Sequence, residues 1–112
     1  MGAPNRHRGE IAARLDGRDY TLCLTLGALA ELESAFAVDD LASLVERFST
    51  GRLSAGDILR VVGAGLRGGG HPFPDEEVAE MQADGAAGGF ARIAVDLLAA
   101  TFGGGEPDGT YG

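Results

Sequence analysis

Two short runs of alternating apolar and polar residues flank an Asp-Gly dipeptide near the start of the chain. Alternation is typical of a strand with one buried face, and Asp16-Gly17 suits a two-residue turn between two such strands. The pattern predicts a β-hairpin over residues 8–24. A lone hairpin is marginally stable in water, so this one must pack on other elements. The residues predicted on its inner face are Ile11, Ala13, Leu15, Tyr20, Leu22 and Leu24.

The remainder of the chain has the spacing of amphipathic helices. Apolar residues recur at i, i+3, i+4 and i+7 in Leu41, Leu44, Val45 and Phe48, which is the clearest helical period in the sequence. Comparable stripes, caps and glycine stops predict helices at about residues 25–37, 40–48, 54–67, 75–81 and 90–102. The stripe of the first of these helices begins at Leu26. The fourth helix has only Val78 and Met81 as large apolar residues and is expected to lie lightly on the core.

These patterns predict an α+β fold, an N-terminal β-hairpin followed by a bundle of about five short helices. A length of 112 residues suits one domain, which we place at residues 8–102. We expect a disordered N-terminus at residues 1–7 and a flexible tail at residues 103–112.

Charge and composition narrow the function classes. Nine basic and 17 acidic residues give a net charge of −8, which would repel a nucleic-acid backbone. We expect no export signal and no membrane insertion, because no apolar stretch has the length that either requires. The single cysteine, Cys23, cannot form an internal disulfide, and a reducing bacterial cytoplasm is therefore the expected location.

Glycine is unusually frequent, at 19 residues, and Gly27, Gly63 and Gly65 fall inside predicted helices. Each such glycine costs about 0.5–1 kcal/mol relative to alanine. Residues 63–68 also match the dinucleotide-binding pattern G-x-G-x-x-G. That site needs a strand before the glycines and a helix after them, whereas here a helix precedes and two prolines follow. A nucleotide-binding domain is accordingly a remote alternative.

No arrangement of residues predicts catalysis or metal binding. His7, His71 and Cys23 lie far apart in sequence without the paired spacing of metal ligands. No nucleophile motif is present. We therefore predict no catalytic, cofactor-binding or metal-binding residues, and a protein that is not an enzyme.

With catalysis and metal binding set aside, the remaining candidate function is binding to another protein. The third predicted helix has apolar residues on more than one side, and the edge of a hairpin can accept a strand from another chain. The residues predicted to bind a partner are Ile58, Val61, Val62, Leu66, Tyr20 and Leu22.

Several segments resemble the small tail proteins of gene transfer agents and related tailed phages. They are LTLGALAELE at residues 24–33, LSAGDIL at 53–59 and GAGLRGGG at 63–70, together with residues 5–10 and 78–81. The resemblance covers roughly residues 5–102. One departure is Pro74, which stands where a capping serine or threonine is expected before the fourth helix.

This resemblance implies a role in building a phage-like tail, with no catalytic residues to transfer. Members of the family are described as tail tube proteins or as tail assembly chaperones. The favoured hypothesis is a chaperone that binds the tape-measure protein, the major tail tube protein or both. The alternative is a structural component incorporated in the particle. The sequence leaves self-association open.

Overall fold

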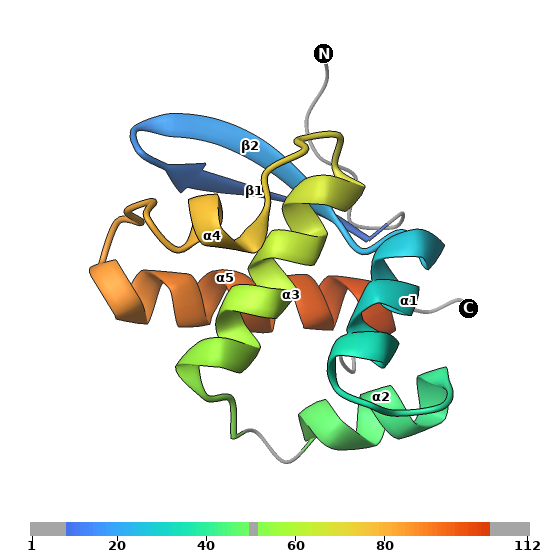
Figure 1. The fold of residues 1–112 in the computed structure, drawn as a ribbon. Helices are drawn as coiled ribbons and strands as arrows, with labels where there is room; N and C mark the ends of the chain where they lie inside the picture. Colours follow the sequence, from blue (N-terminus) through green and yellow to red (C-terminus); the bar gives the residue numbers. More distant parts are fainter. Residues whose placement is uncertain (1–8, 50–51, 104–112) are drawn as a thin grey trace, which may run out of the picture.

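The chain folds into a hairpin followed by helices, which confirms the predicted α+β class (Figure 1). The computed structural model describes residues 9–49 and 52–103. The predictions for residues 1–7 and for the tail beyond Gly103 lie outside these described residues. The elements are β1 (Glu10–Leu15), β2 (Arg18–Cys23), α1 (Leu26–Ala35), α2 (Leu41–Ser49), α3 (Ala55–Gly68), α4 (Asp75–Val78) and α5 (Ala86–Phe102).

The hairpin has the predicted register. β1 and β2 pair antiparallel, with Leu15 opposite Arg18 at the turn. Asp16 and Gly17 have φ values of 54° and 76°, which is the signature of a type I′ turn. This turn matches the right-handed twist of the strands, so the local sequence sets which side chains face inward.

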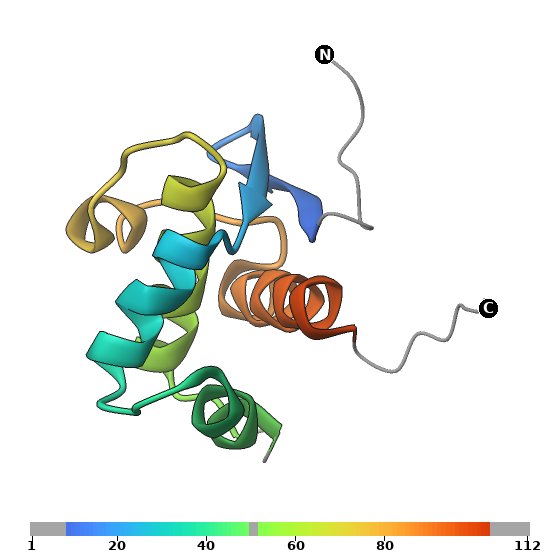
Figure 2. The same ribbon diagram turned by 90° about the vertical axis from the view of Figure 1, so that its right-hand side faces the viewer.

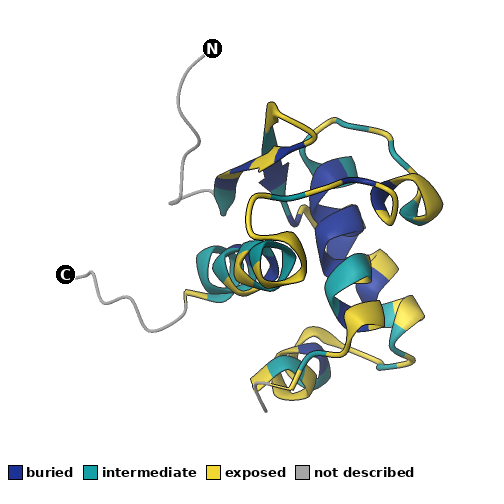
Figure 3. Ribbon diagram, turned by 90° about the vertical axis from the view of Figure 1, so that its left-hand side faces the viewer, coloured by how far each residue is buried: buried dark blue, intermediate teal, exposed yellow. Residues whose placement is uncertain are grey.

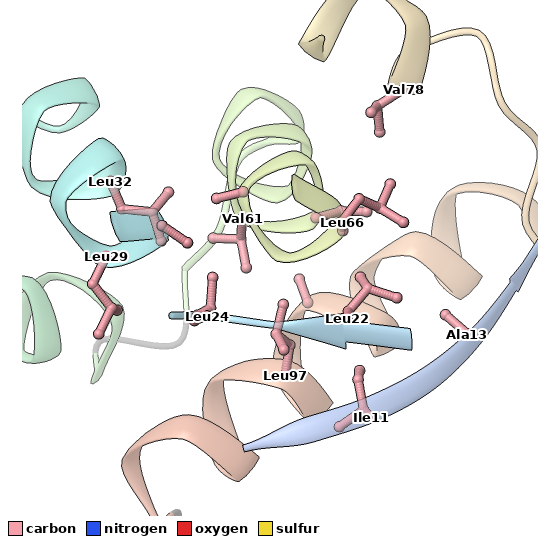
Figure 4. Packing of buried hydrophobic residues seen from close by; sticks show 14 of the residues in the cluster. Ile11, Ala13, Leu22, Leu24, Leu29, Leu32, Val61, Leu66, Val78 and Leu97 are labelled. Carbon is pink, nitrogen blue, oxygen red and sulfur yellow. The ribbon is translucent and has the colours of Figure 1, made fainter. Parts of the chain in front are cut away.

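Helix α3 is the centre of the fold. It contacts β2, α1, α4 and α5, and the hairpin also lies along α5 (Figures 1 and 2). The side chains of β2, α1 and α5 converge on it in the core (Figure 4). The largest fully buried side chains are Leu15, Leu22, Leu32, Leu44, Leu66, Leu97, Val61, Val62 and Val78.

Two predicted details are wrong. Leu26 begins the predicted stripe of α1 but is 77% exposed, because the buried face of α1 is formed by Ala28, Leu29 and Leu32 and Leu26 lies to one side of it. Helix α4 is short, yet Val78 and Met81 are both buried, so this segment is well anchored to the core.

Helix α2 is the most peripheral helix. It packs mainly against α1 and stands apart from the hairpin (Figure 3). Leu44 is its only buried residue, while Leu41 and Val45 remain partly exposed. The strong helical period of this segment therefore predicted its secondary structure correctly but not its depth of burial.

Candidate partner-binding surface

The six residues predicted to bind a partner occupy two different environments. Leu22, Val61, Val62 and Leu66 are fully buried among the other core residues. Only Ile58 and Tyr20 are partly exposed. Of the six, Ile58 and Tyr20 are therefore the two that a partner can contact in this fold.

The burial of the α3 residues has a simple cause. A helix that is apolar on several sides is typically buried on those sides. The extra apolar face of α3, which includes Val61, packs toward α1, while Leu66 lies on the side of α4 and α5 (Figure 4). The apolar residues on several sides of α3, which suggested a docking face, are explained by the central position of this helix in the fold.

Tyr20 belongs to a small aromatic cluster at the edge of the hairpin. Its ring meets His71 edge-on with centroids 4.9 Å apart and Phe73 edge-on at 5.7 Å. The two loop rings are nearly parallel to each other, at 6.4 Å. These contacts hold the loop between α3 and α4 against β2, so the visible role of Tyr20 is to position that loop.

Ile58 lies in an apolar groove of the described surface. The groove has a volume of about 260 Å³ and lies between α4 and the first turns of α3 and α5. This is below the roughly 300–1,000 Å³ of typical small-molecule sites, and suits a few side chains of another protein. Its lining residues are Ala55, Ile58, Leu59, Val78, Ala79, Ala87 and Phe90.

One rim of this groove is charged. An adjoining hollow shares Leu59 and Ala79 with the groove and adds Arg60, Asp75 and Glu76. Exposed Glu77 and Glu80 continue the acidic character along α4 and just after it. This rim therefore carries charges of both signs, and its Asp75 carboxylate is paired with Arg67 at 3.0 Å.

Arg67 holds the α4 wall of the groove in place. Its Nη2 donates to Oε1 of Glu31 at 2.7 Å, and its Nη1 donates to Oδ1 of Asp75 at 3.0 Å and to the carbonyl of Phe73 at 2.7 Å. Hydrogen bonding to Glu31, supported by Asp75, raises the pKa of the Arg67 guanidinium above its ordinary value. Gly63 makes room for this network, because a Cβ there would collide with the Asp75 carboxylate.

The first turn of α3, which carries the opposite wall, is fixed by a capping box. Ser54 accepts from the backbone N–H of Asp57, and Asp57 accepts from that of Ser54, each at 3.1 Å. Arg47 of α2 donates to the same Asp57 carboxylate at 3.1 Å and lies 5.0 Å from the centre of the Phe36 ring. Side-chain contacts within the chain therefore hold both walls of the groove in place without a ligand.

Most of the groove was not predicted from the sequence. Val78, Ala79, Ala87 and Phe90 come from segments that were assigned only to the core or to loops. The one available signal was Ile58, which was among the residues predicted to bind a partner. Which elements would complete the groove depends on how α4 and α5 cross α3.

The glycines of the G-x-G-x-x-G pattern lie within α3 and at its end. A Cβ at Gly65 would meet Leu97 and Leu22, and one at Gly68 would meet the carbonyl of Cys23. Neighbouring protein atoms therefore occupy the space that a phosphate would need. These glycines allow close packing of α3 against its neighbours, which helix propensities alone do not predict.

The fold and this surface define a small α+β protein whose described surface includes an apolar groove with a charged rim. The described residues contain no group of three or more histidine, cysteine or acidic side chains placed to hold a metal ion. No helix in residues 9–49 or 52–103 combines the length and apolarity needed to cross a bilayer.

Comparison with known proteins gives the family. A family model described as "Phage tail tube protein, GTA-gp10" matches residues 8–104. The chain therefore belongs to this family of phage-like tail proteins, as its resemblance to tail proteins of gene transfer agents implied. Its role lies in the structure or assembly of a phage-like tail, which involves contact with other tail components. Searches of curated proteins and of solved structures found no match.

Proposed function

We propose that this chain is a non-catalytic tail assembly chaperone that binds the tape-measure protein in the bacterial cytoplasm. The observation that carries the proposal is the apolar groove beside α4, with charged side chains at its rim. A client segment with exposed apolar side chains would be held there until tube subunits enclose it. Residues 8–102 would act as one domain in this role.

The size of the sheet supports a chaperone over a tube subunit. A ring-forming tube subunit needs a sheet large enough to continue from one copy to the next. Within the described residues the sheet has two strands only, β1 and β2. A hairpin of this size is better suited to a small binding domain than to the wall of a tube.

The second candidate is a structural tail component, which the family description itself favours because it names a tail tube protein. In that case the same groove would contact the neighbouring tube subunit permanently. The two candidates differ in the client and in the lifetime of the complex, so both can be followed by co-purification.

A single substitution in the groove tests the proposal. Ala87 is exposed in the first turn of α5 and lines the groove. Ala87→Glu places a carboxylate on the apolar floor, where an apolar client would have to desolvate it. The helix itself should tolerate the change, because acids are favourable near a helix N-terminus.

The measurement is recovery of the tape-measure protein with the tagged chain from cells that assemble tails. We expect the wild-type chain to recover it and Ala87→Glu to lower recovery by tenfold or more. Val95→Glu is the matched control, since Val95 is 57% exposed on the same helix outside the groove. Equal recovery with Ala87→Glu and wild type, or no recovery with wild type, would contradict the proposal.

A further inference from the structure

The two edges of the hairpin have different surroundings. The edge of β2 is covered by the end of α3, where Gly68 and Gly69 lie against the carbonyl oxygens of Cys23 and Thr21. A Cβ at either glycine would collide with these oxygens. No additional strand can therefore pair with β2.

Among the residues that the structure describes, the backbone contacts that reach the outer edge of β1 lie at its end near the turn. Leu15 forms a bridge with Ala83, and the backbone N–H of Asp16 donates to the carbonyl of Gln82 at 2.8 Å. Earlier in the strand, Ala12 is exposed. The part of β1 that another strand can approach is residues 10–14.

The register of the hairpin decides which backbone groups face outward on this edge. Leu15 and Arg18 close the two-residue turn as a hydrogen-bonded pair. Pairs alternate along an antiparallel ladder, so Glu10, Ala12 and Arg14 direct their backbone groups away from β2. In the described part of the chain, no backbone bond from outside the hairpin reaches the N–H or C=O of Ala12.

The charges along β1 identify a fitting occupant. Consider a second β1 that runs antiparallel to the first with Ala12 opposite Ala12. Each residue whose backbone groups point away from β2 then lies opposite a residue of the other copy whose backbone groups also point away from β2. Glu10 of each copy is then directly opposite Arg14 of the other. Opposite charges across a strand pair are stabilising, whereas like charges, which commonly protect exposed edges, are destabilising.

The small side chain of Ala12, at the centre of this arrangement, also favours pairing of the two strands. Ala12 would lie on the two-fold axis, where a larger side chain would meet its own copy. Arg14 already pairs with Asp19 at 3.2 Å, with side chains 54% and 78% exposed. That pair lies in solvent, and Arg14 can contact a second carboxylate without leaving the first.

We propose that two copies of this chain associate through β1, antiparallel about Ala12, to form one continuous sheet. The occupant of the edge is a second copy because the charge pattern is self-complementary. Five residues from each copy bury much less than the roughly 1,200–2,000 Å² of a stable interface. The dimer is accordingly weak and forms at high local concentration. This proposal does not depend on the chaperone function.

Charge reversal tests the register. Arg14→Glu alone places two glutamates opposite each other at both ends of the interface, and Glu10→Arg alone does the same with arginines. Each single variant should weaken dimerisation roughly tenfold, from two pairs that change from attraction to repulsion. The double variant Glu10→Arg, Arg14→Glu restores opposite charges and should recover the wild-type dimerisation constant.

The double variant also separates this contact from the internal pair. Like Arg14→Glu alone, it places a carboxylate at position 14 beside Asp19, so both variants carry the same unfavourable internal contact. Glu10 also has an interaction within its own chain, and Glu10→Arg alone controls for the loss of that interaction. Recovery in the double variant relative to both single variants therefore measures contact between copies. Sedimentation equilibrium up to about 1 mM protein measures each constant. A wild-type chain that stays monomeric over this range would overturn the proposal, as would a double variant that dimerises no better than the single variants.

Ala12→Pro gives an independent measurement. The N–H of Ala12 faces outward, so proline is compatible with this edge strand and removes a donor only from the proposed interface. We expect the folded variant, verified by circular dichroism, to be monomeric. Arg18→Glu, an exposed change on β2, is the control and should leave the dimer unchanged. Unaltered dimerisation of Ala12→Pro would overturn the proposal.

Discussion

Glycine residues in α3 show how a residue that weakens a helix can be required by the fold. Gly63, Gly65 and Gly68 lie against a carboxylate, two leucine side chains and a backbone carbonyl, respectively. The helix gives up about 0.5–1 kcal/mol at each glycine relative to alanine. In return, α3 approaches α4, α5 and β2 more closely than a Cβ would allow.

Gly68→Ala should therefore destabilise the protein. The added Cβ collides with the carbonyl oxygen of Cys23, which is part of the backbone and cannot rotate away. We expect the free energy of unfolding to fall by about 1–3 kcal/mol, the usual cost of overpacking. Urea denaturation followed by circular dichroism measures it.

Gly27→Ala is the matched control. Gly27 lies in the first turn of α1, where the nearest atom to an added Cβ is Oγ1 of Thr25, at 3.9 Å. The same substitution should raise the free energy of unfolding by up to about 0.5–1 kcal/mol, because nothing opposes the gain in helix propensity. Effects of the same sign in the two variants would show that close packing does not explain the α3 glycines.

Among the elements, the hairpin was predictable from the sequence because its determinants are local. The alternation of apolar and polar residues determines which side chains face inward, and Asp16-Gly17 determines the turn type and hence the register. The helices follow from their period in the same way, except that α5 begins at Ala86, within the glycine-rich segment before the start predicted at residue 90. Even the unusual start of α4 is visible in sequence, because Pro74 occupies the cap position and makes no side-chain cap bond.

Burial of each helix was less predictable, because it depends on contacts between elements. Leu26 and Leu29 belong to the same predicted stripe, yet only Leu29 lies against the core. The candidate site shows the same limit. Ile58 was identified, but its groove partners Val78 and Phe90 join it only through the crossing of α4 and α5 over α3.

Helix α2 provides a prediction at this scale, through the cap at its start. Oδ1 of Asp40 accepts from the backbone N–H of Ser43 at 2.8 Å, and this bond lowers the pKa of the Asp40 carboxyl. A carboxyl with a lowered pKa stabilises the folded state above its unfolded pKa. The stabilisation is lost as the pH falls through the lowered value.

We therefore expect the first turn of α2 to open in acid before the hairpin and α3 do. Amide hydrogen exchange at Ser43 and Leu44, corrected for intrinsic rates, measures this opening as the pH falls below the ordinary pKa of aspartate. Asp40→Asn keeps an acceptor oxygen at the cap but cannot titrate, so its first turn should lose this pH dependence. The same pH dependence in both proteins would assign the effect to another group.

At the scale of the whole molecule, the two candidate surfaces use different elements. The groove belongs to α3, α4 and α5, and the open edge belongs to β1. Ala87→Glu and Ala12→Pro consequently test client binding and self-association separately. A small acidic domain with two such surfaces can bind a client through the groove and pair with one further copy through β1.

We propose that this tail protein acts during assembly and leaves before the particle is complete. Quantitative mass spectrometry of purified particles, compared with tape-measure complexes from the same cells, tests it most directly. We expect the chain to be abundant in the complexes and far below stoichiometric amounts in finished tails. A fixed, stoichiometric copy number in finished tails would contradict it and identify the chain as a structural component.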